Sequence, residues 1–236
     1  MKKILITTGG TGGHVIPAEI IGEHLKDSYE IHYSTDVRGL KYLTSKKNRT
    51  LIINTPKLDL NFLILFKLVK LFFLSFKSIF YLRKEKISKI VSTGGYMSLP
   101  IIISAKILKL KIFLLEPNLT LGRGNKFFLN FSNKIICYSD KLINFPKKFL
   151  YKIELVSPLV SRAFYEIEKQ ENKNKNFCFL ISGGSQGAKI FDEIIKETLS
   201  DLAEKHSLKV IQQTNIKNIE NLKKFYDLKN IDNEIF

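Results

Sequence analysis

Short apolar runs alternate with helix-length segments along most of the chain. We expect strands in the apolar runs, at residues 2–8, 30–34, 50–54, 89–92, 111–115, 134–137 and 153–156. Between them, helical patterns are clearest at residues 17–26, 98–109 and 123–131. Because strands that alternate with helices form parallel βαβ units, the pattern predicts an α/β fold with a doubly wound sheet.

A polar segment interrupts this pattern, and the alternation then starts again. Residues 166–175 have almost nothing to bury, which is typical of a domain boundary. We expect a first Rossmann-like domain at 1–163, a linker at 164–176 and a second such domain at 177–236. The second domain opens with strand 177–181, helix 188–205, strand 208–212 and a short helix near 217–226. About sixty residues are too few to close a core, so the second domain is predicted to be incomplete.

Composition narrows the class of protein. With 44% hydrophobic and 25% charged residues, the chain is expected to fold rather than stay disordered. The net charge of +16 has two interpretations, solvated lysines on an ordinary surface or attraction to a polyanion. The chain has no nucleic-acid-binding motif, so we expect no nucleic-acid partner and favour an anionic membrane.

The cysteines and the N-terminus suggest an intracellular protein. Cys137 and Cys178 lie in apolar strand-like runs without metal-ligand spacing. We expect both to be reduced core residues, and we expect no metal site. The apolar run at residues 2–8 is too short for a signal peptide.

Three glycine-rich turns each follow a predicted strand and precede a helix, at residues 8–14, 92–96 and 182–188. Glycine allows positive φ and a close approach of the backbone to a ligand, and free N–H groups at a helix start favour an anion. The spacing differs from the dinucleotide-binding G-x-G-x-x-G, and we expect no acidic residue in the matching place after the second strand. The turns predict ligands in a cleft at the carboxyl ends of two facing sheets, without a nicotinamide cofactor.

Two ionisable residues adjoin these turns. His14 lies at the start of the helix after the first turn, where the helix terminus disfavours an imidazolium. It is therefore a candidate general base or orienting group, or else a cap-region residue that only packs against the loop. Glu116 follows the apolar run 112–115 and should emerge at the carboxyl edge of the sheet, either in the site or in a solvent-facing turn.

The turn segments resemble those of the MurG family in sequence, order and spacing. The resemblance rests on Gly9–Pro17, Gly94–Tyr96, Glu116–Asn118, Gly122–Asn125 and Gly183–Ala188. That family consists of peripheral membrane transferases of GT-B fold. They move N-acetylglucosamine from UDP-GlcNAc onto lipid I (undecaprenyl-pyrophosphoryl-MurNAc-pentapeptide) and so form lipid II for peptidoglycan. The resemblance implies an inverting glycosyltransferase on the cytoplasmic face of the inner membrane, with no cofactor.

The resemblance also implies the site residues. His14 and Glu116 would be catalytic. The substrate-binding residues would be Thr11, Gly12, Gly13, Gly95, Tyr96, Asn118, Asn125, Arg162, Ser185 and Gln186. Two departures from the family pattern stand out. Pro117 replaces a glutamine, which removes an N–H and a side-chain amide, and Arg162 is displaced relative to Pro158.

The family pattern continues past the features found here. Its Arg-Ser-Gly-Ala turn and later donor contacts have no counterpart in residues 217–236. Two alternatives to the enzyme therefore stay open. One is a glycosyltransferase acting on another membrane lipid. The other is an inactive remnant or half-subunit that binds a separate C-terminal half.

Residues 58–82 form a long apolar segment with interior lysines. Lys67, Lys70 and Lys77 would each cost roughly 2.5–3.5 kcal/mol at mid-bilayer, which argues against a transmembrane span. With Ser78 and Lys84 they form one basic stripe beside a broad apolar face. This pattern favours an interfacial helix on an anionic membrane over a helix that only covers the sheet.

Overall fold

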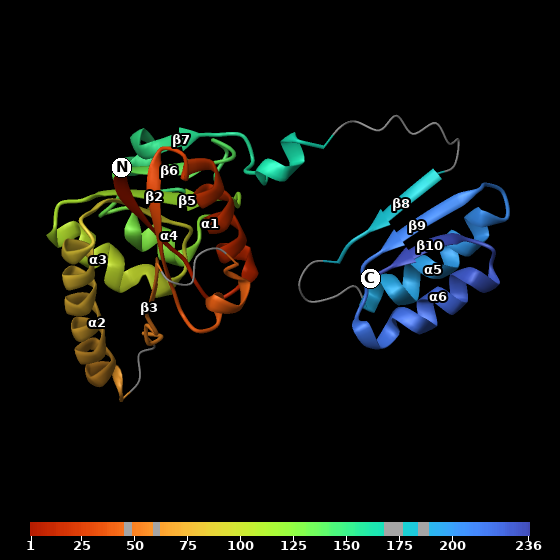
Figure 1. Cartoon of the computed structure of the whole chain (residues 1–236), viewed down its shortest axis with the longest axis horizontal. Coiled ribbons are helices and arrows are strands. Elements are labelled where there is room, and N and C mark those ends of the chain that lie inside the picture. Colours follow the sequence, from red (N-terminus) through yellow and green to blue (C-terminus); the bar gives the residue numbers. More distant parts are fainter. Residues whose placement is uncertain (45–48, 59–61, 168–176, 184–188) are drawn as a thin grey trace. The chain divides into compact units, whose positions relative to one another are not determined.

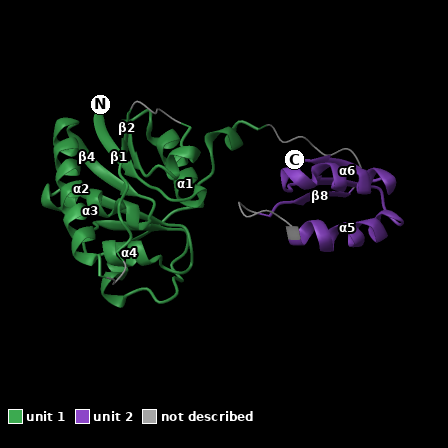
Figure 2. Cartoon of the chain, turned by 90° about the horizontal axis from the view of Figure 1, so that it is seen from below, with its two compact units in different colours: residues 1–167 green, residues 168–236 purple. Residues whose placement is uncertain are grey.

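The computed structural model describes residues 1–44, 49–58, 62–167, 177–183 and 189–236 (Figure 1). The chain divides into two compact units, residues 1–167 and 168–236 (Figure 2). Most of the expected linker at 164–176 lies outside the described residues. Its first residues belong to a short 3-10 helix, Arg162–Tyr165.

The first unit contains a seven-stranded sheet in which every neighbouring pair is parallel. In chain order its strands are β1 (Lys2–Thr7), β2 (Tyr29–Thr35), β3 (Thr50–Ile52), β4 (Ile87–Ser92), β5 (Lys111–Glu116), β6 (Lys134–Cys137) and β7 (Ile153–Leu155). Its α-helices are α1 (Gly12–Leu25), α2 (Ile64–Lys84), α3 (Leu99–Ile107) and α4 (Arg123–Phe128). Strands of this kind are readily recognised in a sequence because they are buried on both faces.

The strand order β3-β2-β1-β4-β5-β6-β7 reverses direction between β1 and β4. Because parallel crossovers are right-handed, the two directions place their helices on opposite faces of the sheet. Both views show α1 across the sheet from α2 and α3 (Figures 1 and 2). The carboxyl ends of β1 and β4 therefore flank the switch point, where ligands bind in open α/β sheets.

Helix α1 begins five residues earlier than the predicted helix 17–26, so Pro17 lies inside it rather than in its first turn. Proline has no N–H, and its ring crowds the carbonyl of the residue four positions earlier. Here that residue is Gly13, which adds no side chain to the crowding. The helix thus starts directly at the glycine turn.

Helix α2 packs on the core through two leucines and two serines. Its buried side chains are Leu71, Ser75, Ser78 and Leu82. The serine hydroxyls donate to carbonyls of the preceding turn, at 2.9 Å for Ser75 and 2.7 Å for Ser78. Ser104 of α3 donates to the carbonyl of Ser75 at 2.8 Å. The placement of Ser78 on an exposed basic stripe is therefore wrong, because this hydroxyl is satisfied inside the helix interface.

The outer side of α2 and the turn before it is apolar and exposed. Its exposed large apolar residues are Phe62, Leu63, Leu65, Phe66, Leu68, Val69, Phe72, Phe73, Phe76 and Phe80. In the part of the chain that the structure describes, no helix is long and apolar enough to cross a membrane.

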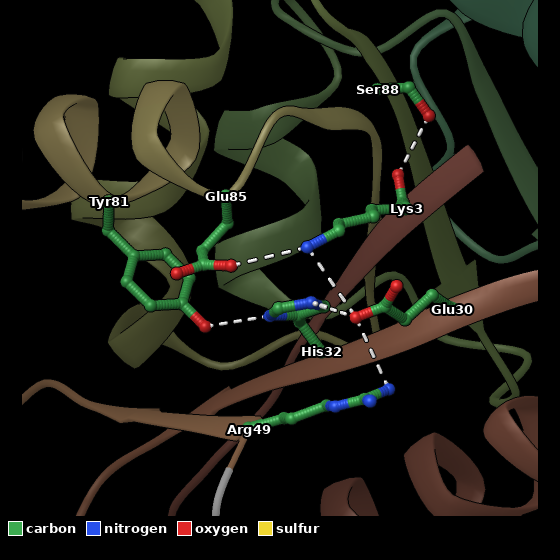
Figure 3. Close-up of polar contacts among 7 residues, drawn as sticks. All are labelled: Lys3, Glu30, His32, Arg49, Tyr81, Glu85 and Ser88. Atoms are coloured by element: carbon green, nitrogen blue, oxygen red, sulfur yellow. Dashed lines mark hydrogen bonds and ion pairs between the residues drawn. The ribbon is translucent and has the colours of Figure 1, made fainter. Parts of the chain in front are cut away.

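A partly buried polar network fixes the C-terminal half of α2 to the sheet (Figure 3). His32 of β2 lies 2.9 Å from the Tyr81 hydroxyl of α2 and 3.3 Å from the Glu30 carboxylate. Lys3 and Arg49 also form ion pairs with Glu30, at 3.5 Å and 3.3 Å. Burial lowers the pKa of His32, so the neutral ring donates from Nε2 to Glu30 and accepts from Tyr81 at Nδ1. Burial also raises the pKa of Tyr81 to about 12.

The second unit has a three-stranded parallel sheet, ordered β10-β9-β8. Its elements are β8 (Phe177–Ile181), α5 (Lys189–Ala203), β9 (Leu208–Gln212), α6 (Ile219–Leu228) and β10 (Asp232–Ile235). Strand β10 was not predicted. Because the order runs in one direction, both helices cover one face and share one core.

The other face of this sheet has exposed side chains, including Leu180 at 70%. This explains one wrong prediction. Cys178 is exposed on β8, whereas Cys137 is buried as expected. Burial raises the pKa of the Cys137 thiol to about 11, so it behaves as a core residue.

Candidate active site

The first two glycine turns meet at the switch point of the sheet. The backbone N–H of Thr93 donates to the carbonyl of Thr7 at 3.2 Å, and the hydroxyls of Thr93 and Thr8 lie 2.8 Å apart. Gly94 and Gly95 have φ of +98° and +80°, a conformation that strains any residue with a Cβ. The two turns therefore form one continuous backbone surface at the carboxyl edge.

A pocket of about 460 Å³ opens beside this surface. It is lined by the turns that follow β4 and β5, by the start of α1 and by residues 56–58. Six of the residues predicted from the sequence lie together along it: His14, Gly95, Tyr96, Glu116, Asn118 and Asn125. They come from three separate chain segments, so the fold assembles them.

The imidazole of His14 has a defined tautomer. Its Nδ1 lies 2.8 Å from the backbone carbonyl of Thr93, which can only accept a hydrogen bond. Nδ1 therefore carries the proton, and in the neutral ring Nε2 holds a lone pair. A Cβ on Gly94 would come within 3.3 Å of the ring, so the glycines leave room for it. Nε2 is thus free to accept a proton from a ligand hydroxyl in the pocket.

Glu116 ends β5, is 2% exposed and is fully engaged by its own loop. One carboxylate oxygen accepts from the backbone and side-chain N–H groups of Asn118, at 3.3 Å and 3.1 Å. The other accepts from the Gly122 N–H at 2.8 Å and from Asn125 Nδ2 at 3.0 Å. A carboxylate with four donors organises the loop between β5 and α4. This geometry favours a positioning role over the predicted catalytic one.

Asn125 has an unfilled acceptor. Its amide nitrogen donates to Leu115 O at 2.9 Å as well as to Glu116, which identifies the other atom as Oδ1. This oxygen is buried and has no hydrogen-bond partner among the described residues. Buried acceptors are normally paired, so a donor group of a ligand fits here.

Thr11, Gly12 and Gly13 form the start of α1, next to the pocket but outside its lining. Thr11 makes no side-chain capping bond to the helix, which leaves the first N–H groups of α1 without a cap. A Cβ on Gly12 would lie 3.4 Å from the Tyr42 ring, so the turn is also packed from outside.

Two residues of this region were missed. Contrary to the expectation that no acidic residue follows the second strand, Asp36 directly follows β2 and is 2% exposed. Its carboxylate accepts from the N–H of Gly10 at 2.8 Å and pairs with Arg38 at 2.8 Å. Burial alone would raise the pKa of Asp36, but these hydrogen bonds outweigh it and hold the pKa below its usual value. Arg38 also donates to the Tyr96 hydroxyl at 3.2 Å and so joins the first two turns.

The remaining predicted residues lie elsewhere. Arg162 pairs with Asp27 at 2.7 Å and reaches the carbonyl of His24, at the opposite end of α1 from the glycine turn. Arg162, which is displaced relative to the family pattern, is held by this local ion pair. Ser185 and Gln186 lie outside the described residues.

The second unit has a polar cluster of its own that sequence reasoning missed. The Asp192 carboxylate, at the start of α5, is buried. It accepts from Gln212, Thr214 and Asn218, at 2.9, 2.6 and 2.8 Å. The cluster fixes the turn after β9 to α5. Among the described residues of both units, no group of three or more His, Cys, Asp or Glu side chains could hold a metal ion.

Residues 4–137, more than half of the chain, match the model of the glycosyltransferase family 28 N-terminal domain. The chain belongs to this family. A relative from Pelagibacter ubique (strain HTCC1062) is 47% identical over 236 residues. It is named UDP-N-acetylglucosamine--N-acetylmuramyl-(pentapeptide) pyrophosphoryl-undecaprenol N-acetylglucosamine transferase. A relative of the same name from Rickettsia bellii (strain RML369-C) is 34% identical over 243 residues. The alignments span this whole chain but only 66% and 68% of those relatives.

Solved structures share the fold of this chain. A crystal structure of Acinetobacter baumannii MurG matches 99% of this chain and 65% of that chain, with a TM-score of 0.71 and 20% identity. A UDP-GlcNAc 2-epimerase from Neisseria meningitidis matches 99% of this chain and 71% of its own, with a TM-score of 0.61 and 13% identity. At these identities the likeness shows the fold alone. The predicted α/β fold of GT-B type, with two parallel sheets, is confirmed, as is the resemblance to the MurG family.

Proposed function

We propose that this chain forms the acceptor-side part of an inverting glycosyltransferase that moves N-acetylglucosamine from UDP-GlcNAc to lipid I. The observation that carries the proposal is the 47% identity over the full chain to a relative with that activity in its name. Since the chain spans about two thirds of that relative, donor contacts made by the other third would come from further residues or from a separate C-terminal half. The pocket supports the assignment, because it joins a histidine whose Nδ1 is held by the Thr93 carbonyl to an acceptor, Asn125 Oδ1, that is buried and unpaired among the described residues.

The proposed reaction is a single displacement at the anomeric carbon of the donor sugar. The C4 hydroxyl of the muramoyl sugar attacks C1, and the bond from C1 to the diphosphate oxygen breaks. UDP leaves with the bonding electron pair, and the configuration at C1 inverts. His14 Nε2 takes the hydroxyl proton, since Nδ1 is committed to Thr93. Glu116 and Asn125 keep the acceptor side of the pocket in shape.

We also propose that the outer side of α2 lies on an anionic membrane, at the cytoplasmic face. Ten large apolar side chains are exposed on α2 and its leading turn. Surface patches of this kind mark interaction sites, and Lys70 and Lys77 lie beside them. Such a contact would make the protein a peripheral membrane enzyme and would place it beside a lipid-linked acceptor.

The test is a transfer assay with radiolabelled UDP-GlcNAc and lipid I. This chain is assayed alone and together with the remaining third of the Pelagibacter relative, supplied as a second polypeptide. We expect lipid II from the mixture, and we expect His14→Gln to slow its formation by roughly 10²–10⁴-fold. Transfer to diacylglycerol or a polyprenol instead of lipid I would identify a different lipid glycosyltransferase. A folded, co-purifying mixture without any transfer would identify an inactive half-subunit.

A further inference from the structure

The charged groups that line the pocket differ in the interactions that they make within the protein. Glu116 is engaged by four N–H donors, and Lys57 also has an interaction within the chain. Arg123, the first residue of α4, lines the same pocket and is exposed. Among the described residues it has no hydrogen-bond or ion-pair partner. The pocket therefore offers a guanidinium whose donors are all available.

We propose that Arg123 binds a phosphate of a diphosphate ester in this pocket, an inference that rests on the proposed glycosyl transfer. A guanidinium presents planar, paired donors that match two phosphate oxygens. Because the carboxylate of Glu116 is turned into its own loop, the accessible charge on this side of the pocket is positive. A diphosphate is present in both the donor and the lipid-linked acceptor of the proposed reaction.

The backbone that carries Arg123 is held in place. Gly122 N donates to Glu116 at 2.8 Å, and Lys126 N donates to Gly122 O at 2.8 Å. A Cβ on Gly124 would lie 3.4 Å from the backbone of Gly95, so α4 starts in direct contact with the second glycine turn. The arginine thus projects from a fixed point beside the pocket, and only its side chain has to order when a ligand binds.

Helix stability does not explain an arginine at this position. A cation at the first residue of a helix opposes the helix dipole and is unfavourable for the helix itself. The buried Oδ1 of Asn125, two residues further on, also has no hydrogen-bond partner within the described parts of the chain. A sugar linked to a diphosphate supplies hydroxyl or amide donors for Asn125 and an anion for Arg123.

The test uses titration calorimetry on the full chain with two soluble probes, geranyl diphosphate and UDP, and geraniol as an uncharged comparison. The variants are Arg123→Gln, Arg123→Lys and the matched control Lys126→Gln, which removes the same charge from the same helix outside the pocket lining. We expect Arg123→Gln to weaken geranyl diphosphate binding at least tenfold, Arg123→Lys to weaken it less, and Lys126→Gln to change it less than twofold. Geraniol binding should not respond to any of the three.

The two probes distinguish the source of the diphosphate. An effect confined to geranyl diphosphate assigns Arg123 to the acceptor, whereas an equal or larger effect on UDP assigns it to the donor. Equal effects of Arg123→Gln and Lys126→Gln, or wild-type protein that binds neither diphosphate, would overturn the inference. A clear Arg123 effect in a mixture that transfers no sugar would leave the anion site standing and reject the proposed reaction.

Discussion

The exposed phenylalanines of α2 allow a direct test of membrane binding. Phe73 and Phe80 are 65% and 68% exposed and lie two turns apart on the outer side of the helix. Both are changed to glutamine, which is a good helix former. Phe164 is 66% exposed on the 3-10 helix Arg162–Tyr165, so Phe164→Gln is a matched control away from α2.

The expected effect follows from the exposed area. A phenylalanine side chain presents about 200 Å², so about 130 Å² of each ring is available to the membrane. At about 25 cal/mol per Å², complete burial of that area is worth about 3 kcal/mol per ring. If the interface buries half of it, the two changes together cost about 3 kcal/mol, or roughly a 100-fold loss in partitioning.

Partitioning is measured by co-sedimentation with vesicles that contain phosphatidylglycerol, at low and at high salt. The double variant should be left in the supernatant at lipid concentrations that pellet both the wild type and Phe164→Gln. Thermal unfolding should change little, because the replaced rings lie on the surface. Equal sedimentation of the double variant and the control would show that α2 does not carry the membrane contact.

Three further predictions concern stability, measured by thermal unfolding. Asp36→Asn should lower the free energy of unfolding by about 1–3 kcal/mol at neutral pH. Because the pKa of Asp36 is lowered in the fold, its contribution to stability is present above about pH 4 and is lost as pH falls. The difference in stability between wild type and variant should therefore narrow from about pH 5 to about pH 3. The pKa of His32 is also lowered, so the wild type should lose stability as pH falls below about 6.5, and an equally steep profile for His32→Gln would refute this. Gly22→Ala should cost about 1–3 kcal/mol because its Cβ would overlap the Tyr33 hydroxyl, and Tyr33→Phe should recover part of that loss; full stability of the single variant would contradict the packing of α1.

The sheets could largely be predicted because central parallel strands are apolar on both faces. Strand β10, Asp232–Ile235, was not predicted because it is a partly exposed edge strand with two acidic residues. The start of α1 was predicted at the wrong residue for a different reason. Gly12 and Gly13 have low helix propensity, and Pro17 suggested a first turn, whereas the strand before the glycines fixes where the helix begins.

The candidate site, like the fold, contains residues that the sequence predicts and residues that it does not. Glycine turns are visible in a sequence because few other residues adopt their backbone conformation. The role of Asp36 depends on Gly10, which lies 26 residues away and becomes its neighbour only when β2 pairs with β1. An acidic residue directly after an apolar strand was the available signal. Arg38 gave none, because its contact with Tyr96 spans the switch point.

The switch point also has a consequence for the order in which the protein folds. Strands β1 and β4 are hydrogen-bonded neighbours, yet residues 8–86 separate them. Contacts between distant residues form late, since the loop between them must first be closed. The connection that closes this loop contains α2, whose inner surface is rich in serine and whose outer surface is rich in phenylalanine. Because α2 precedes β4 in the chain, a nascent chain can complete the β1–β4 edge of the pocket only after the segment that contains α2 has been synthesised, so the apolar surface is already present when the site first forms.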